Sequence, residues 1–193
     1  RGLMVPGGSF TEEFRAIEVQ PLDGKQYSKT SNLNLISKSS NLFGPQNIVA
    51  QGRCVLREQC VLRGDMGKIT LGKCCFVGPN TLLHPSPKQF SWGLGFLPLQ
   101  VGDFVRFGDS CVIKSSAIGS CVVIGNNCVL GPRSVVKDCV VLQPDTVVPP
   151  DMVLPPYTVW GGNPCTLKGT LSEAVSKTHE WQCEELFASL APK

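Results

Sequence analysis

Residues 118–160 read IGSCVVIGNNCVLGPRSVVKDCVVLQPDTVVPPDMVLPPYTVW, and this stretch decides the fold. A large apolar residue returns in it at every sixth position without a miss. Eight successive hits would arise by chance in roughly one register in a thousand when 42 % of the residues are hydrophobic. Such a short fixed period predicts a repeat architecture, in which each unit packs on its neighbours. The eight residues are Ile118, Ile124, Leu130, Val136, Leu142, Val148, Leu154 and Trp160.

Each six-residue unit also has a smaller residue two positions before the large one, such as Val122, Cys128 or Ser134. Glycine or proline often follows the large residue, as at Gly125 and Pro149. We expect one short strand per unit and then a corner, where glycine accepts a positive φ and proline lies where no ladder N–H is needed. Three such units close one triangular coil of a parallel β-helix.

The period extends upstream to Leu56 with interruptions, and it is lost between Leu83 and Val101. Residues 84–100 contain three prolines and are expected to form an extruded loop. The chain is therefore predicted to be all-β, with about six triangular coils stacked at the usual strand spacing. Residues 1–43 are expected to form an irregular capping segment, residues 44–168 the β-helix, and residues 169–193 a C-terminal capping α-helix.

Composition excludes several classes of function. The net charge of +3 is small and dispersed, which argues against nucleic acid or an anionic membrane as a partner. No apolar run is long enough to span a membrane, so we expect a soluble intracellular protein without direct membrane insertion. The ten cysteines include no C-x-x-C pair, and many unpaired thiols indicate a reducing cytosol. Five cysteines occupy the small inward position and are expected to fill the core: Cys54, Cys60, Cys75, Cys111 and Cys128.

The segment that begins with Arg63-Gly64-Asp65 and leads to His84 resembles the γ-class carbonic anhydrases. That resemblance implies a trimer in which three histidines hold a catalytic zinc ion. His84 matches the first of these histidines, but the other two align with Asp109 and Lys114. Since the chain contains only one further histidine, His179, we predict no metal site, no cofactor and no catalytic residue.

A hexapeptide-repeat acyltransferase is the other enzymatic alternative. In that class one histidine acts as general base on an acceptor hydroxyl or amine. His84 is the candidate, because it lies at the root of the predicted loop, where a substrate has room to bind. No carboxylate stands near it in the sequence to orient the ring, and an imidazole that anchors the loop is the alternative.

A second resemblance covers about residues 44–171. Residues 88–99 read KQFSWGLGFLPL and lead into Val101-Gly102-Asp103, and the paired prolines of residues 148–150 and 154–156 follow later. These features resemble the dynactin subunit 5 family of β-helical proteins. The resemblance implies a left-handed β-helix and a non-catalytic scaffold subunit of the dynactin pointed-end complex, which supports dynein-driven transport and cargo engagement.

The same resemblance implies a set of partners and a location. The partners are a second β-helical dynactin subunit, the pointed-end actin-related protein, other dynactin subunits and the dynein cargo machinery. The location is the cytoplasm, in association with the cytoskeleton.

Five residues are candidate partner contacts: Arg63, Asp65, Phe90, Trp92 and Phe96. Exposed aromatic side chains on a loop mark an interface more often than a substrate pocket. The alternative is that the loop folds over its own prism and buries these rings. Arg63 and Asp65 lie on a protruding corner, where they either bridge to a neighbouring subunit, as the γ-class resemblance implies, or pair with each other.

Overall fold

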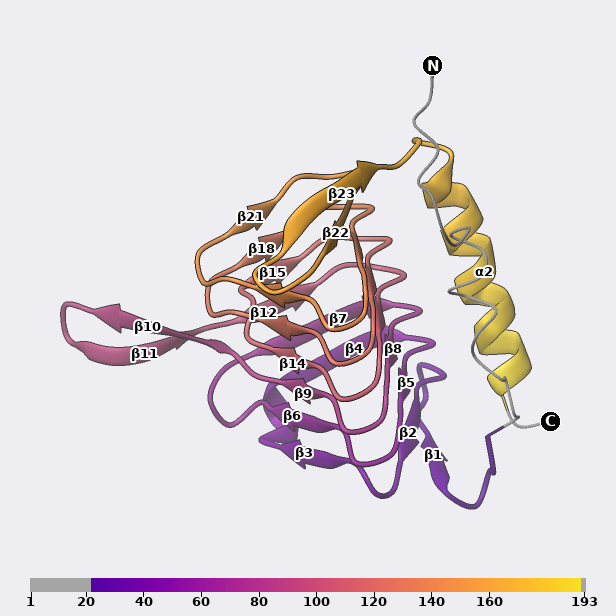
Figure 1. Ribbon diagram of the computed structural model, residues 1–193. Helices are drawn as coiled ribbons and strands as arrows, with labels where there is room; N and C mark the ends of the chain where they lie inside the picture. Colours follow the sequence, from indigo (N-terminus) through magenta and orange to yellow (C-terminus); the bar gives the residue numbers. More distant parts are fainter. Residues whose placement is uncertain (1–21, 192–193) are drawn as a thin grey trace.

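Three sheets form the sides of a triangular prism in residues 22–191, the part of the chain that the computed structural model describes (Figure 1). The first, called the helix-covered sheet here, contains β1 (Tyr27–Lys29), β2 (Leu35–Ser37), β5 (Val55–Leu56), β8 (Phe76–Val77), β13 (Arg106–Phe107), β16 (Val123–Ile124), β19 (Val141–Leu142), β22 (Thr158–Gly161) and β23 (Thr166–Thr170). The second sheet contains β3 (Asn41–Phe43), β6 (Val61–Arg63), β9 (Leu82–Leu83), β14 (Val112–Ile113), β17 (Val129–Leu130) and β20 (Val147–Val148). The third sheet contains β4 (Ile48–Gly52), β7 (Ile69–Lys73), β12 (Leu99–Val101), β15 (Ala117–Ile118), β18 (Val135–Val136) and β21 (Val153–Leu154).

The chain visits the three sheets in turn, so each complete coil contributes one strand to each side. The second and third sheets have six strands each, which makes six coils, and every pairing within these two sheets is parallel. The large residue of one coil lies directly over that of the next, as Ile124 does over Phe107 and under Leu142. The predicted left-handed β-helix of about six coils is confirmed.

The large residues of the six-residue period point into the prism. Seven of its eight members in residues 118–160 are at most 3 % exposed, and only Trp160, at the last coil, is partly exposed. Burial of one such aliphatic side chain stabilises the fold by about 2 kcal/mol. The smaller residues two positions earlier are also inside, and all five cysteines predicted there are fully buried.

The corners differ from expectation. Their positive φ angles fall three residues before seven of the eight large residues from Ile118 to Trp160, on residues such as Cys121, Asn127 and Asp145. Gly125 follows the large residue and has no positive φ. A Cβ at Gly125 would lie 2.6 Å from the backbone nitrogen of Pro144 in the next coil. The predicted reason for glycine was therefore wrong, because these positions need glycine for the close approach of neighbouring coils.

The β-helix begins earlier than predicted. β2 pairs in parallel with β5, and β3 pairs in parallel with β6, although both strands lie within the expected irregular segment 1–43. For residues 35–43 that expectation is wrong, because Ile36 and Leu42 already keep the six-residue spacing and pack against the core. Before them, β1 pairs antiparallel with β2. Residues 1–21 of the predicted capping segment lie outside the described residues.

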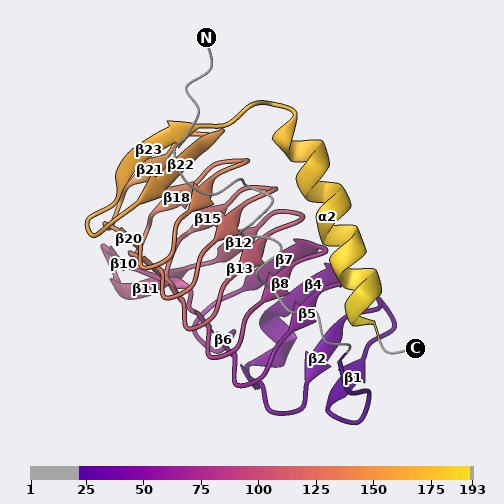
Figure 2. The ribbon, with the colours of Figure 1, turned by 45° about the vertical axis from the view of Figure 1, so that its right-hand side comes forward.

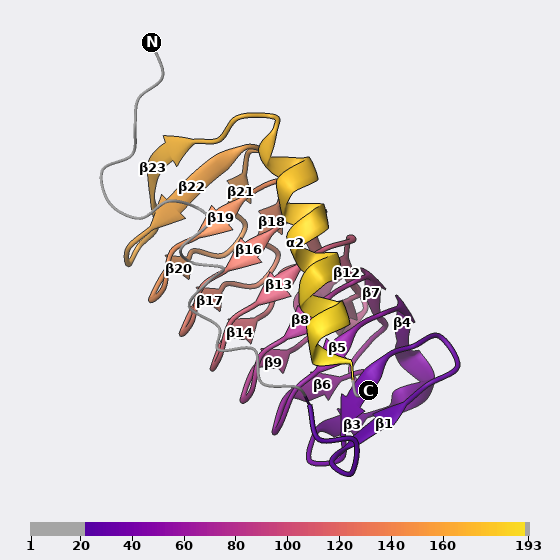
Figure 3. The same cartoon turned by 90° about the vertical axis from the view of Figure 1, so that its right-hand side faces the viewer.

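The C-terminal helix α2 (Val175–Leu190) lies along the helix-covered sheet and not across an end of the prism (Figures 2 and 3). Its Cys183 and Leu190 form a buried cluster with Leu35, Val55 and Phe76, which point outward from that sheet. The prediction that this helix caps an end is therefore wrong in position. Because apolar side chains point outward from several successive strands of this sheet, an element that packs against the side of the prism is needed to bury them.

All ten cysteines are buried and unpaired. Burial raises the pKa of the Cys183 thiol to about 12, so this thiol is protonated at neutral pH. No helix among residues 22–191 is long and apolar enough to cross a membrane.

One histidine makes the docking of α2 sensitive to acid. His179 is fully buried, and its Nε2 donates a 2.7 Å hydrogen bond to the carbonyl oxygen of Phe104. Burial, with the charge of Arg106 as a smaller cause, lowers the pKa of His179 from 6.5 to about 4. The His179 ring therefore stays neutral in the folded state down to about pH 4, whereas in the unfolded chain it takes up a proton below about pH 6.5.

We predict that the free energy of unfolding falls as the pH drops from about 6.5 to about 4, by roughly 3 kcal/mol from this group. Urea titrations across that range measure it. His179→Gln should flatten this part of the profile. An identical pH profile for His179→Gln and the parent would contradict the assignment.

Candidate protein-binding site

The extruded loop is a β-hairpin that projects from the prism edge between the second and third sheets, away from α2 (Figure 1). It consists of β10 (Ser86–Phe90) and β11 (Gly93–Leu97), which pair antiparallel from Ser86 opposite Leu97 to Phe90 opposite Gly93. The extrusion was predicted from the loss of the period, but its strand content was not. Gly93 has a φ of 134°, which lets the two-residue turn close.

The hairpin tip carries a stack of side chains on one face. The rings of Phe90 and Trp92 lie nearly parallel with their centroids 5.0 Å apart, and the ammonium of Lys88 lies 5.3 Å from the centre of the Phe90 ring. Both rings cross over Gly95, where a Cβ would lie 2.8 Å from each of them. The stack therefore holds Trp92 in one orientation while leaving it 73 % exposed.

A further apolar residue at the tip was missed by the sequence analysis. Leu94 is 63 % exposed and pairs across the hairpin with Gln89. The alternation of side chains along a strand places it on the face opposite Gly95 and the stack. Its signal was present in the sequence as a leucine between two glycines, but only the antiparallel register shows that it points outward. Trp92 and Leu94 together make the tip apolar on both faces.

Phe96 lies at the base of the hairpin and is half-buried. Its ring meets the ring of His84 edge to face, with centroids 5.8 Å apart, and its Cβ lies near Gly67 on the corner of an earlier coil. Of the three predicted aromatic contacts, Phe90 and Trp92 therefore lie at the tip, whereas Phe96 packs on the prism. The position of Phe96 makes it a support of the hairpin.

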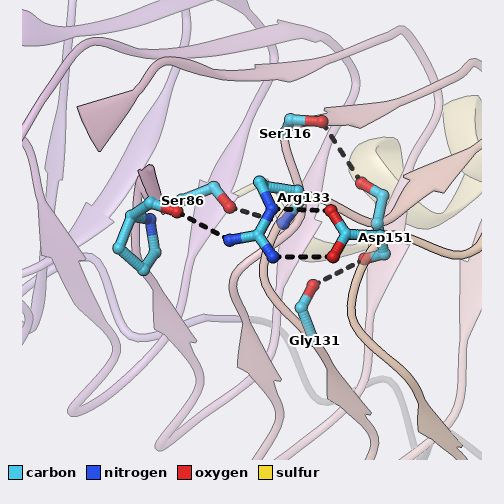
Figure 4. Close-up of polar contacts among 7 residues, drawn as sticks. Ser86, Ser116, Gly131, Arg133 and Asp151 are labelled. Atoms are coloured by element: carbon cyan, nitrogen blue, oxygen red, sulfur yellow. Dashed lines mark hydrogen bonds and ion pairs between the residues drawn. The ribbon is translucent and has the colours of Figure 1, made fainter. Parts of the chain in front are cut away.

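The ion pair of Arg133 and Asp151, called the clamp here, holds the base of the hairpin (Figure 4). The guanidinium of Arg133 binds Asp151 through two hydrogen bonds of 2.6 Å and also donates to the carbonyl oxygen of Pro87 at 3.1 Å. These bonds join the hairpin to two coils at once. The hydrogen bonds from Arg133 lower the pKa of the Asp151 carboxyl, so this pair stays ionised well into the acid range.

The clamp exists because one coil is a residue short. Ile113 and Ile118 are only five positions apart, so the corner between them is one residue short. The missing residue is the one whose carbonyl oxygen would accept a hydrogen bond from the same corner of the following coil. At regular corners that bond is made, as from Asn127 N–H to the carbonyl oxygen of Asp109. The N–H of Arg133 instead donates to the hydroxyl of the fully buried Ser86, at 2.5 Å. The hairpin thus supplies, through Ser86, the hydrogen-bond acceptor that this corner would otherwise lack.

Arg63 and Asp65 pair with each other within one corner. Two hydrogen bonds of 2.8 Å join them, and the guanidinium also lies 5.3 Å from the centre of the Phe43 ring. The bonds from Arg63 lower the pKa of Asp65. This corner lies on the same prism edge as the hairpin, since β6 and β9 are neighbours in the second sheet. Of the two roles that the sequence left open, pairing with each other is observed.

The histidines are not assembled into a metal site. His84 Nδ1 lies 2.6 Å from the carbonyl oxygen of Pro85, whereas His179 lies on α2 against Phe104. Within residues 22–191 no group of three or more histidine, cysteine or acidic side chains has a metal-binding arrangement.

The clamp yields a prediction about hairpin order. Arg133→Gln should increase amide hydrogen exchange across residues 86–97, because the bonds to Asp151 and Pro87 are lost. The loss of global stability should be small, because the pair is exposed to solvent. Arg63→Gln breaks a comparable exposed pair elsewhere and should leave exchange in the hairpin unchanged. Equal exchange in both variants would contradict the clamp.

Comparisons with known proteins agree with this geometry. The chain is similar to solved structures of a hexapeptide transferase family protein from Anaplasma phagocytophilum (18 % identity, TM-score 0.65, covering 83 % of this chain and 89 % of that one) and of the N-acyltransferase AntD from Bacillus cereus (14 % identity, TM-score 0.64, covering 83 % and 98 %). At such low identity these similarities show the fold alone.

The sequence comparisons are more specific. The chain is 45 % identical over 178 residues to a dynactin subunit 5 from Dictyostelium discoideum, which covers 91 % of this chain and 90 % of that protein. The profile of the dynactin subunit 5 family matches residues 20–182. The chain therefore belongs to the dynactin subunit 5 family.

Proposed function

We propose that this chain is a non-catalytic scaffold subunit of the dynactin pointed-end complex, in the cytoplasm and associated with the cytoskeleton. Its partners there are a second β-helical subunit, the pointed-end actin-related protein and other dynactin subunits. Through them the chain supports the engagement of cargo by dynein. Family membership supports a place in dynactin.

The hairpin tip is the observation that carries the proposal. Trp92 and Leu94 are among the most exposed large apolar side chains of the described residues, yet the hairpin that holds them is clamped by Arg133 and packed through Phe96. A rigid, exposed aromatic pays little conformational entropy on binding, and tryptophan is enriched among residues that dominate binding energy. We therefore assign Phe90, Trp92 and Leu94 to a partner interface, with Arg63 and Asp65 beside it on the same edge.

The proposal predicts a selective loss of binding. Trp92→Ala combined with Leu94→Ser should reduce recovery of dynactin subunits with the tagged chain at least tenfold, because the tip side chains would no longer fill a pocket on the partner. Affinity isolation from the native cytosol, with mass spectrometry of the named dynactin subunits, measures this.

The chain offers a matched control for this experiment. Trp181 on α2 and Leu167 on β23 are also exposed and lie on elements outside the hairpin. Trp181→Ala with Leu167→Ser removes the same chemical groups and should leave recovery unchanged. Equal recovery with both double variants would refute the role of the tip, and a stable homotrimer that binds acyl-CoA without dynactin subunits would refute the scaffold function itself.

A further inference from the structure

A groove of about 330 Å³ runs beside α2 on the helix-covered sheet. Its floor contains a column of three glycines, Gly78, Gly108 and Gly125, which directly follow β8, β13 and β16. Because glycine has no side chain, the surface of the sheet is bare along this column. The helix packs instead against preceding residues of these strands, such as Phe76, and Figure 3 shows it running beside them.

The walls of the groove are largely apolar. Leu186 and Leu190 of α2 line one side, and the exposed Pro144 lies at the corner that leads to the second sheet. Phe76 and Val123 alternate with inward residues of β8 and β16, so their side chains point outward into the groove. A groove with such walls favours an occupant that brings apolar side chains of its own.

Two guanidinium groups also line the groove. Arg106 lies close to α2, since its charge adds to the effect of burial in lowering the pKa of His179. Arg57 is ion-paired with Glu58 at 3.3 Å. Among the described residues that line the groove, Asp109 carries the one carboxylate. An occupant that combines apolar side chains with carboxylates therefore suits both the walls and the cations.

The described part of the chain begins at this groove. Leu22 is buried in one cluster with Leu190, and its N–H donates a 3.3 Å hydrogen bond to the carbonyl oxygen of Leu190, which also lines the groove. The lining residues belong to or directly follow five successive strands: β5, β8, β13, β16 and β19. At the usual strand spacing this is a length of about 19 Å, which about six extended residues span. The chain that precedes Leu22 is thus tethered beside the groove and is long enough to fill it.

We infer that residues 10–19 of this chain lie in the groove and form a strap along α2. They read FTEEFRAIEV, with four large apolar residues and three glutamates, whereas residues 1–9 contain no carboxylate. This composition matches the apolar walls and the two arginines. A segment tethered at Leu22 also has an effective concentration on the order of mM at the groove, which favours it over a peptide from another protein.

The strap gives the helix-covered sheet a second lateral cover. The helix α2 buries outward residues such as Val55 and Phe76, and the strap covers the glycine column beside them. The inference does not rest on the proposed function, because it concerns contacts within one chain.

A photo-crosslinking amino acid placed at Pro144 of the full, tagged chain, in its native cells, tests the inference. We expect a crosslink to a peptide that overlaps residues 10–19, identified by mass spectrometry. The product should keep the mass of a single chain on a denaturing gel, because both ends of the crosslink belong to one molecule. The same probe at Val129, an exposed outward residue of the second sheet, is the positional control and should not give this crosslink.

Four results would overturn the inference: no crosslink from Pro144 to residues 10–19, the same yield from Val129, a crosslink to a second copy of the chain, or a crosslink to another protein. Recovery of dynactin subunits with the tagged chain is measured in the same preparation. The strap and the proposed function can therefore fail independently of each other.

A charge-neutralising variant tests the electrostatic part. Glu12→Gln, Glu13→Gln and Glu18→Gln together should reduce the yield of the crosslink at least about threefold, because the carboxylates that face the arginines are lost. The matched control is Glu173→Gln, Glu180→Gln and Glu185→Gln, which removes the same charge from exposed residues on or just before α2 and should not reduce the yield. An equal yield in both triple variants would contradict recognition of the carboxylates.

Discussion

The structure depends on the stacking of inward side chains at intervals of six residues. Each coil has only short strands, and two neighbouring coils share few hydrogen bonds on each side. A two-residue strand pair has little stability by itself, so the ladder persists because Ile124, Leu130 and their equivalents are buried between the coils on either side. The period fixes which residues face inward, and the side chains that remain outward fix what each face of the prism can do.

The outward residues divide the prism surface into regions with different roles. The helix-covered sheet carries buried outward residues such as Val55 and Phe76, and α2 packs against them. The short corner after Ile113 leaves an N–H of Arg133 for Ser86, and this bond turns an insertion into an oriented hairpin. A small departure from the repeat, the missing residue in one coil, is thus where the surface that we assign to a partner arises.

Much of this fold was predictable, because the same six-residue pattern recurs in successive coils and each recurrence supports the same strand and corner. Ile118 to Trp160 predicted the coils, and the inward cysteines were placed correctly. The predictions that were wrong concerned parts of the chain outside the long regular repeat, where a single feature of the sequence was the basis of each prediction. Ile36 and Leu42 keep the period but were not recognised as a first coil, and α2 was placed over an end because the pattern of its apolar residues does not say which surface it covers. For the hairpin, Trp92 was found by its type, whereas Leu94 and the clamp needed the strand register and the proximity of Arg133 to residues more than forty positions earlier.

The central claim is that the clamped hairpin presents Trp92 to another protein. Hydroxyl-radical footprinting of the tryptophans, in the isolated chain and in the chain assembled with its complex, tests it most directly. The account predicts that oxidation of Trp92 falls strongly on assembly while that of Trp181 on α2, which is also exposed, does not change. Equal oxidation of Trp92 in the two states would contradict the account.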